Sequence, residues 1–284
     1  LRERMSEEYG MDLRSKSDAQ IAEAVIKKEL EKLTGSRIYK PDFRPGTKFK
    51  YRTPDFLCFQ TPVMQQTLQM VQDATFVVTG KGKVDMPKAL EEAKIRIGNS
   101  MYRMGIGGLH SSESTVAHFS DENYQLIDRD VTSYYPMIIL NQGLYPKHLG
   151  PKFLSVYRSI VERRIAAKKA GDTVTANSLK ITINGSFGKF GSQYSVLCSH
   201  DLLVQTTLTG QLSLLMLIES LELAGIPVVS ANTDGVVIKC PRAKLDKLKY
   251  LVGCWELNTG FDTEETRYKA LYSKDVNNYI AIYE

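Results

Sequence analysis

The chain has 284 residues, of which 43% are hydrophobic and 24% charged, and its net charge is +5. This composition supports a folded core of one large domain or two modest ones, and it excludes a disordered or low-complexity chain. We find no apolar run long enough to span a bilayer and no signal-peptide pattern, so we expect no membrane partner. Because the chain opens with Leu1 rather than Met, we expect a fragment or a processed piece.

The cysteines and histidines form no framework of metal ligands or disulfides. The four cysteines are widely spaced without a CxxC pair, and the four histidines are also scattered: Cys58, Cys198, Cys240, Cys254, His110, His118, His148 and His200. A zinc site is therefore not expected. The pattern favours a reducing compartment, the cytoplasm.

The first hundred residues contain two segments with helical signals. Ser17 or Asp18 is typical of a helix cap, and apolar residues recur near helical spacing from 21 to 30. Residues 36–60 read as irregular because prolines interrupt them. Residues 87–103 predict a second helix, which opens at Pro87 and runs into the glycine-rich break at 105–108.

From residue 123 the elements become clearer. Residues 124–131 predict a strand. A basic helix starts at 150–151 and ends near Gly171, and Asp172 or Thr173 caps a second helix that runs to about Phe187. Residues 201–224 predict a long, largely apolar helix, which Gly225 closes.

The last third predicts the rest of a sheet. Two apolar runs, 226–231 and 236–240, flank the tight-turn composition of residues 232–235. Pro241 opens another helix, and residues 267–272 and 279–283 predict a hairpin. Without the basic helix pair, the order is strand–helix–strand–strand–helix–strand. We therefore expect an α+β fold, a split βαβ antiparallel sheet backed by helices on one face, with the helix pair projecting from it.

Positive charge is concentrated in the helix pair. Residues 151–190 contain eight basic and two acidic side chains, so this window carries more than the whole net charge of the chain. Such a patch fits a polyanionic partner, a nucleic acid or a triphosphate. A solvated helix face rich in Lys and Arg is an equally good reading of the charge alone.

Asp130 and Asp234 stand out by their places in this plan. Asp130 ends a strand, and Asp234 lies in the turn between two strands of the same sheet. Neighbouring strands are about 4.8 Å apart, so the two carboxylates can share two metal ions about 3.5–4 Å apart. Mg²⁺ suits such a site. The alternative is that both are ordinary turn residues, since Asp is common in turns.

The second basic helix adds a third feature. Lys180 and Asn184 are four residues apart and share one face, and Arg164 and Lys168 have the same spacing on the preceding helix. Two antiparallel helices can aim such groups at one triphosphate, for which Arg offers a fork and Lys a point charge. Basic residues at this spacing are more often simply solvated.

Three motifs together resemble those of family B DNA polymerases. The run DVTSYYPMII from Asp130 resembles motif A, DxxSLYPSII, and KITINGSFG from Lys180 resembles motif B, KxxxNSxYG. The run ANTDGV around Asp234 resembles motif C, the xDTDS turn. The motifs occur in the family's order, each on the expected strand, helix or hairpin, and the resemblance covers about residues 100–284.

The resemblance implies roles by position. Asp130, Asp234 and the main-chain carbonyl of Val131 would bind two Mg²⁺ ions, with Mn²⁺ as an alternative. The dNTP would be held by the backbone amides near Ser133 and Tyr134, by Tyr135 under the sugar, and by Arg164, Lys168, Lys180 and Asn184. The primer–template DNA would meet Gly107, Gly108, His110, Phe187, Gly188, Thr233, Lys274 and Tyr279. For Gly107 and Gly108 a plain turn is the alternative, and the Lys274/Tyr279 spacing fits the family poorly.

The sequence also departs from the family. Motif C has Asn232 for the first Asp and Gly235 for Ser, and motif B has Gly185 for Ser and Phe187 for Tyr. Asn232 removes a negative charge from the expected metal site. The helix pair between motifs A and B is short and leaves no room for the insertions of protein-primed relatives.

Taken together, the residues predict a polymerase core in four parts. Residues 1–100 are expected to be an exonuclease remnant or a linker, 101–150 the first part of the palm, 151–191 the fingers and 192–284 the second part of the palm. A thumb is expected to be absent or truncated. No exonuclease DxE motif precedes Asp130, so exonuclease and thumb regions are expected outside this chain. The short fingers suggest a phage-like enzyme of the host cytoplasm.

The expected reaction is attack of a primer 3′-OH on a dNTP. The alternative from another class is a decayed palm that binds DNA or assembles with other proteins. A reverse transcriptase is disfavoured because there is no YxDD turn.

Overall fold

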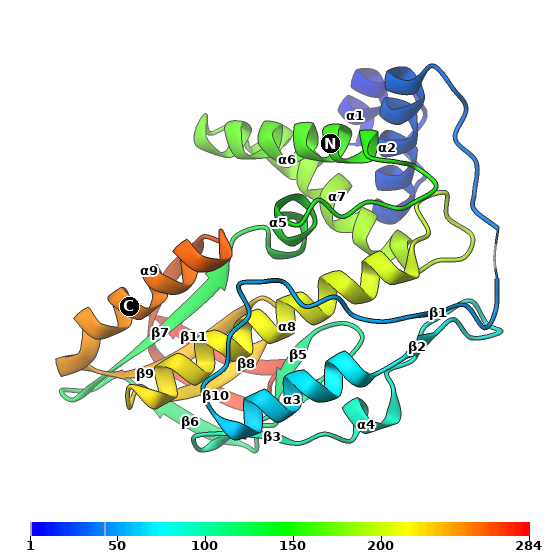
Figure 1. The fold of residues 1–284 in the computed structure, drawn as a ribbon. Coiled ribbons are helices and arrows are strands. Elements are labelled where there is room, and N and C mark those ends of the chain that lie inside the picture. Colours follow the sequence, from blue (N-terminus) through cyan, green and yellow to red (C-terminus); the bar gives the residue numbers. More distant parts are fainter. Residues whose placement is uncertain (1, 43) are drawn as a thin grey trace. The chain divides into compact units, whose positions relative to one another are not determined.

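The computed structural model describes residues 2–42 and 44–284 (Figure 1). They form two units. The helical unit consists of residues 2–42, 44–48, 77–85 and 138–204, and the sheet unit of residues 49–76, 86–137 and 205–284. The boundaries fall inside two helices, α5 (Tyr134–Asn141) and α8 (His200–Leu223). Residues 1–100, expected as one region, are thus divided between the two units.

The helical unit is built from two pairs of helices. They are α1 (Arg2–Tyr9), α2 (Asp18–Thr34), α6 (Lys152–Lys169) and α7 (Thr173–Phe190). The helix predicted after residue 17 is α2: Ser17 accepts a hydrogen bond from the Gln20 amide, and the Gln20 side chain accepts one from the Ser17 amide. This capping box satisfies two amides that the first helical turn leaves unpaired.

The predicted basic helix pair is confirmed as α6 and α7. Asp172 caps α7 by accepting a hydrogen bond from the Thr175 amide at 3.0 Å. The pair closes around aromatic side chains, because Phe153 of α6 stacks on Tyr157 at 5.3 Å and meets Phe190 of α7 edge to face at 6.0 Å.

The sheet unit contains a nine-stranded, antiparallel sheet, counted over the described residues. Its strands are β3 (Ile95–Ile97), β4 (Ser100–Met104), β5 (Leu109–Ser111), β6 (Val116–Phe119), β7 (Tyr124–Val131), β8 (Val228–Asn232), β9 (Gly235–Pro241), β10 (Thr263–Asp275) and β11 (Asn278–Tyr283). The spatial order is β11-β10-β7-β9-β8-β5-β4-β3, and β6 pairs with β10.

The central four strands have the split βαβ arrangement that the sequence predicts. With α5, α6 and α7 left aside, the chain runs through β7, α8, β8, β9, α9 (Leu245–Thr259) and β10, and these strands lie in the order β10-β7-β9-β8. A 3-10 turn, Arg242–Lys244, leads into α9. Trp255 of α9 donates its indole N–H to the Ser213 carbonyl of α8, so the two helices that back the sheet are tied together.

The predicted helix at 87–103 is wrong. Only Lys88–Glu91 is helical (α4), and β3 and β4 follow as a hairpin across Gly98-Asn99, where Gly98 has φ 59°. The physical reason is that buried and exposed residues alternate with a period of two, as in a strand. Ile95, Ile97 and Tyr102 are buried, whereas Arg96 and Arg103 are exposed. The remaining elements are α3 (Pro62–Asp73) and the two short strands β1 (Lys48–Phe49) and β2 (Phe76–Val77), which pair.

α8 corrects the expectation that the chain contains no apolar run long enough to span a bilayer. By length and composition it could cross a membrane, the single such helix among the described residues, so an apolar run of sufficient length does exist. However, 89% of that stretch is buried inside the structure, as in the core helix of a globular protein. Its buried polar side chains hold other segments of the sheet unit: Gln205 bonds both backbone groups of Arg52, and Glu219 accepts hydrogen bonds from Gln60 and Thr61.

Candidate active site

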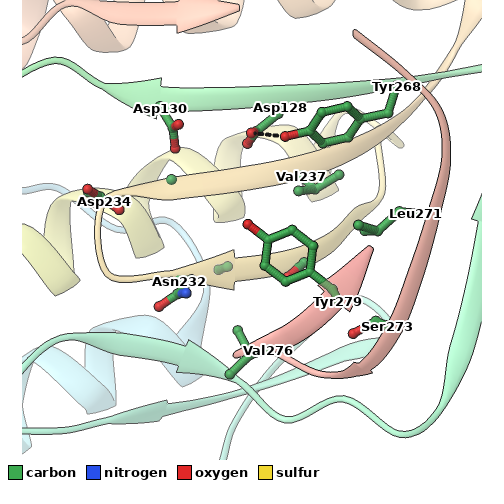
Figure 2. A pocket seen from close by; sticks show the side chains of 13 residues that line it. Asp128, Asp130, Asn232, Asp234, Val237, Tyr268, Leu271, Ser273, Val276 and Tyr279 are labelled. Carbon is green, nitrogen blue, oxygen red and sulfur yellow. Dashed lines mark hydrogen bonds between the residues drawn. The ribbon is translucent and has the colours of Figure 1, made fainter. Parts of the chain in front are cut away.

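The fold brings Asp130 and Asp234 to one pocket. Asp130 lies near the end of β7 and Asp234 in the turn between β8 and β9, and the Val131 amide donates to the Asp234 carbonyl at 2.8 Å. Figure 2 shows both carboxylates at this pocket, whose volume is about 170 Å³. Its lining is Asp128, Asp130, Ser230, Ala231, Asn232, Asp234, Gly235, Val237, Tyr268, Leu271, Ser273, Val276 and Tyr279.

Gly235 is required by the approach of Asp130. The two residues face each other in the β7–β9 ladder, and a Cβ built on Gly235 would collide with the Asp130 carboxylate. Glycine at this position therefore has a local cause. A Ser here would push the carboxylate away from its present position.

Both acidic motifs contain a strained backbone. Ser133 has φ 51° and Thr233 has φ 44°, and they are the non-glycine residues with positive φ in the described part of the chain. This region of φ is costly for side chains with a Cβ, and it is found at functional sites when the surroundings enforce it. Here one such residue follows Asp130 and the other precedes Asp234.

The pocket concentrates uncompensated negative charge. Burial and the neighbouring Asp128, Asp234 and Glu264 raise the pKa of Asp130 to about 6. Burial also raises the pKa values of Asp128 and Asp234. Among the described residues, those that line the pocket include no Lys, Arg or His to balance these charges.

This charge distribution fits a divalent cation. Within residues 2–42 and 44–284, no group of three or more His, Cys, Asp or Glu side chains is arranged to hold a metal ion by itself. Mg²⁺ does not need such a cage, because it is usually bound by one or two carboxylates together with substrate phosphates and waters. The Asp130/Asp234 pair therefore fits Mg²⁺ bound jointly with a phosphorylated substrate.

The sequence reasoning missed Asp128. It lies two residues before Asp130 on the same face of β7, and its carboxylate accepts a hydrogen bond from the Tyr268 hydroxyl at 2.6 Å (Figure 2). The signal was present, since residues two apart in a strand share a face. Asp128 is thus a third carboxylate in the pocket, whereas Asn232 supplies no carboxylate where the motif C that the sequence resembles has its first Asp.

The glycine-rich segment 105–108, here called the glycine loop, lies beside motif C. The Thr233 amide donates to the Leu109 carbonyl at 2.8 Å, and His110 pairs with Asn232 across β5 and β8. A Cβ on Gly108 would come within 2.9 Å of the Thr233 hydroxyl. The close approach of the two segments therefore requires glycine at 108.

Tyr135 and Gln211 hold the same loop. The Tyr135 hydroxyl donates to the Gly107 carbonyl at 2.7 Å, which connects motif A to the loop. Gln211, buried in α8, accepts from the Gly105 amide at 3.0 Å and donates to its carbonyl at 2.8 Å. Nothing in the sequence distinguished Gln211 from the other polar residues of this helix.

Lys274 and Tyr279 lie at the end of the sheet formed by β10 and β11. Tyr279 reaches the acidic pocket (Figure 2) and, with Lys274, also lines a second, open hollow of about 620 Å³. Tyr279 faces Ser273 across the two strands, and an irregularity in the register follows at Lys274. The structure thus places both residues along one hollow despite their unusual spacing.

The predicted phosphate-binding residues belong to the helical unit. Lys180, Asn184 and Gly188 form one exposed stripe on α7, as the spacing predicts. Phe187 is half-buried and meets Phe190 edge to face at 6.1 Å. On α6, Lys168 is exposed and Arg164 is half-buried.

Only the backbone of Tyr134 is available to a ligand. Its ring is buried, and its hydroxyl donates to the Gly210 carbonyl at 2.6 Å. Tyr134 begins α5, and the first amides of a helix have no partner within the helix. Such a helix start suits an anion.

Comparison with known proteins gives a distant likeness. No protein-family model matches the sequence, and no curated protein is similar to it in sequence. A solved structure of the family B DNA polymerase from the hyperthermophilic archaeon Pyrobaculum calidifontis is similar, with a TM-score of 0.46 and 14% identity. The match covers 78% of this chain but 31% of that polymerase. At this distance the likeness carries no weight for function, which depends on the residues of the site.

Proposed function

We propose that this chain carries out template-directed DNA synthesis, the transfer of a nucleotide from a dNTP to a primer 3′-OH. The observation that supports this most directly is the acidic pocket. Two carboxylates from a strand end and a neighbouring turn converge there without a balancing positive side chain. Chemistry at a phosphoryl group depends mainly on positioning and charge neutralisation, which such a site is suited to provide.

Asp130, Asp234 and the Val131 carbonyl would hold the metal ions. When bound, two Mg²⁺ or Mn²⁺ ions supply the positive charge that activates the primer hydroxyl and neutralises the triphosphate. Asp130 would contribute an ionised carboxylate at neutral pH, because its pKa, which burial and its acidic neighbours raise to about 6, still lies below 7; only in acid would a proton compete with the metal.

Two sets of residues are assigned to the dNTP. The amides that begin α5 at Ser133 and Tyr134 would hold the triphosphate tail, and the ring of Tyr135 would lie under the sugar and exclude a 2′-OH. Side chains of the helix pair would bind the phosphates: Arg164, Lys168, Lys180 and Asn184. Support for these last roles is the exposed stripe that Lys180 and Asn184 share on α7, together with the positive charge of Arg164, Lys168 and Lys180.

The primer–template would run past the pocket. We assign the glycine loop, the motif C turn, the end of α7 and the Lys274/Tyr279 hollow to DNA contacts, through Gly107, Gly108, His110, Thr233, Phe187, Gly188, Lys274 and Tyr279. In this assignment the sheet unit acts as a palm and α6–α7 as fingers. The reaction would take place in the cytoplasm, that of a host cell if the chain is phage-encoded.

Single-turnover primer extension tests the proposal. Enzyme in excess is mixed with primed DNA template, Mg²⁺ and dNTPs. Templated extension is expected for the wild type. It should fall by at least about a thousandfold in Asp234→Asn, which loses a charge that the reaction requires. Asp246→Asn makes the same exchange on the exposed surface of α9 and should extend normally.

A decayed palm is the rival outcome. Asn232 and Gly235, which stand where the motif C that the sequence resembles has Asp and Ser, favour that class, and it predicts binding of primer–template without any extension. Extension that is equally robust in Asp234→Asn would contradict the assignment of the metal site.

A further inference from the structure

The face of α7 that is proposed to bind nucleotide lies beside a second stripe of residues, to which no function has been assigned so far. Lys180, Asn184 and Gly188 form the exposed stripe of this helix. The residues that each follow by one position are Ile181, Gly185 and Lys189. Consecutive helical residues are offset by about 100° around the axis, so this second stripe lies directly beside the first.

α2 covers the second stripe along its length. Ile181 packs against an apolar cluster from the amino-terminal segment, formed by Met5, Tyr9, Leu13, Ile21 and Val25. One turn later, Gly185 meets the start of α2, and a further turn on, Lys189 pairs with Glu23 at 3.0 Å. Three successive turns of α7 are therefore held by residues 5–25.

Gly185 permits the closest of these contacts. A Cβ at this position would lie 2.5 Å from the Asp18 carbonyl oxygen and 3.0 Å from the Ala22 Cβ. A backbone carbonyl in the first turn of a helix cannot give way as a flexible side chain can. Glycine inside a helix costs about 1 kcal/mol relative to alanine, and the close approach of α2 accounts for its presence where the family has Ser.

Glu23 extends the connection beyond α7. Besides pairing with Lys189, it accepts hydrogen bonds from the Val196 amide at 2.8 Å and the Ser195 hydroxyl at 2.9 Å. Burial raises the pKa of Glu23, but these donors outweigh burial and hold the pKa below its ordinary value. One carboxylate thus joins α2, the end of α7 and the following loop.

α1 holds the other helix of the pair. Glu8 accepts a hydrogen bond from Arg163 of α6 at 2.6 Å. Arg4 donates to the Thr175 hydroxyl at 3.5 Å, near the start of α7. The α6–α7 pair is therefore part of a four-helix assembly within the helical unit, not a hairpin that stands alone.

We propose that α2 is a docking brace that positions Lys180 and Asn184 for the dNTP, with Gly185 and Glu23 as positioning residues. The inference rests on the proposed function and adds an element to it. Neither residue is assigned a contact with the nucleotide. They act by holding the neighbouring stripe of α7, so that the orientation of the grip depends on residues near the amino terminus.

The first test compares two alanine substitutions in the full chain. Gly185→Ala places a methyl group against Asp18 and Ala22, whereas Gly253→Ala adds one inside α9, where no atom lies within 4 Å. Both changes favour helix formation equally. Hydrogen–deuterium exchange should therefore become faster over residues 18–34 and 178–189 in Gly185→Ala alone. Unchanged exchange in that variant would overturn the docking contact.

The second test asks what the brace does for nucleotide. In Gly185→Ala, the affinity of the enzyme–primer–template complex for a dNTP should fall by about tenfold, and the dNTP KM should rise by about tenfold. The rate at saturating dNTP and the affinity for primer–template should stay within about twofold of the wild type. Faster exchange with an unchanged dNTP KM would show a purely structural contact and overturn the positioning role.

Glu23 gives an independent series that avoids the steric clash. Glu23→Gln keeps an oxygen acceptor for Val196 and Ser195, and Glu23→Ala removes it. The dNTP KM should rise in the order wild type, Gln, Ala, and equal values in all three would contradict the proposal. If the wild type neither binds dNTP nor extends a primer, the proposed function fails and the positioning role with it, while the exchange experiment still reports on docking.

Discussion

At the residue scale, the most informative group is Asp130. Its carboxylate opposes Gly235 in the ladder and shares a pocket with Asp128 and Asp234. Repulsion among these groups is tolerable only if protons or a cation reduce it. The same arrangement that makes the site fit a metal therefore makes its occupancy sensitive to pH.

The Mg²⁺ requirement is expected to increase in acid. The pKa of Asp130 is raised to about 6, so protons compete with the cation as the pH falls through that value. The Mg²⁺ concentration for half-maximal extension should rise by about tenfold for each pH unit below the pKa. Mg²⁺ titrations of single-turnover extension on both sides of pH 6 measure this. A requirement independent of pH would argue against Asp130 as a ligand.

Two substitutions of Tyr135 separate the contribution of its ring from that of its hydroxyl group. Tyr135→Ala removes the ring and should raise incorporation of ribonucleotides relative to deoxynucleotides by at least about tenfold. Tyr135→Phe keeps the ring but removes the hydroxyl and its hydrogen bond to the Gly107 carbonyl, so sugar selectivity should remain. Competition between dNTP and NTP in primer extension gives both ratios. Equal selectivity in the alanine variant would refute the proposed role.

At the scale of elements, α8 shows how a buried helix positions a loop. Its polar side chains form hydrogen bonds with the backbone of irregular segments, in the way that a neighbouring strand does in a sheet. Gln211 satisfies both backbone groups of Gly105, next to the glycine loop.

Gln211→Ala is therefore expected to affect stability and DNA binding together. The substitution leaves an amide and a carbonyl without partners, which costs about 1–3 kcal/mol. Urea unfolding should show this loss, and the affinity for primer–template should fall because the loop beside Thr233 is released. Ser220→Ala in the same helix removes only a bond to the helix's own Met216 carbonyl and serves as the control. Wild-type stability in Gln211→Ala would show that water replaces the amide.

At the scale of the whole molecule, the acidic pocket works against the stability of the metal-free fold. The pKa of Asp130 is higher in the folded chain than its ordinary value of 3.8. Its contribution to stability is therefore fully present below pH 3.8 and is lost as the pH rises through about 6. At neutral pH the ionised carboxylate is a net cost.

Asp130→Asn should accordingly stabilise the metal-free protein at pH 7. The side chain is partly in solvent, so screening limits the gain to about 1 kcal/mol or less. Saturating Mg²⁺ should stabilise the wild type more than the variant, because binding to the folded state alone adds to its stability. Thermal unfolding with and without Mg²⁺ measures both effects, with Asp246→Asn as the control. A loss of stability in Asp130→Asn would contradict the account of the pocket.

Much of this molecule follows from local features of the sequence. The cap at Ser17, the helix pair, the strand at 124–131 and the turn at 232–235 lie where their residues predict them. Those signals act between residues a few positions apart, through hydrogen bonds and periodic burial. The error at 87–103 arose because a hairpin of period two was taken for a helix, although Gly98-Asn99 marked its turn.

The tertiary structure alone decided which distant residues meet. The sheet order places Asp130 against Gly235, brings Asp128 to Tyr268, and sets Thr233 beside Gly108. In the helical unit, packing laid α2 along α7 and made glycine necessary at 185. No local signal reports such contacts, because they depend on the close packing of surfaces separated by a hundred residues or more. The sequence by itself determined the motifs and most elements after residue 123, and packing decided the partners of each.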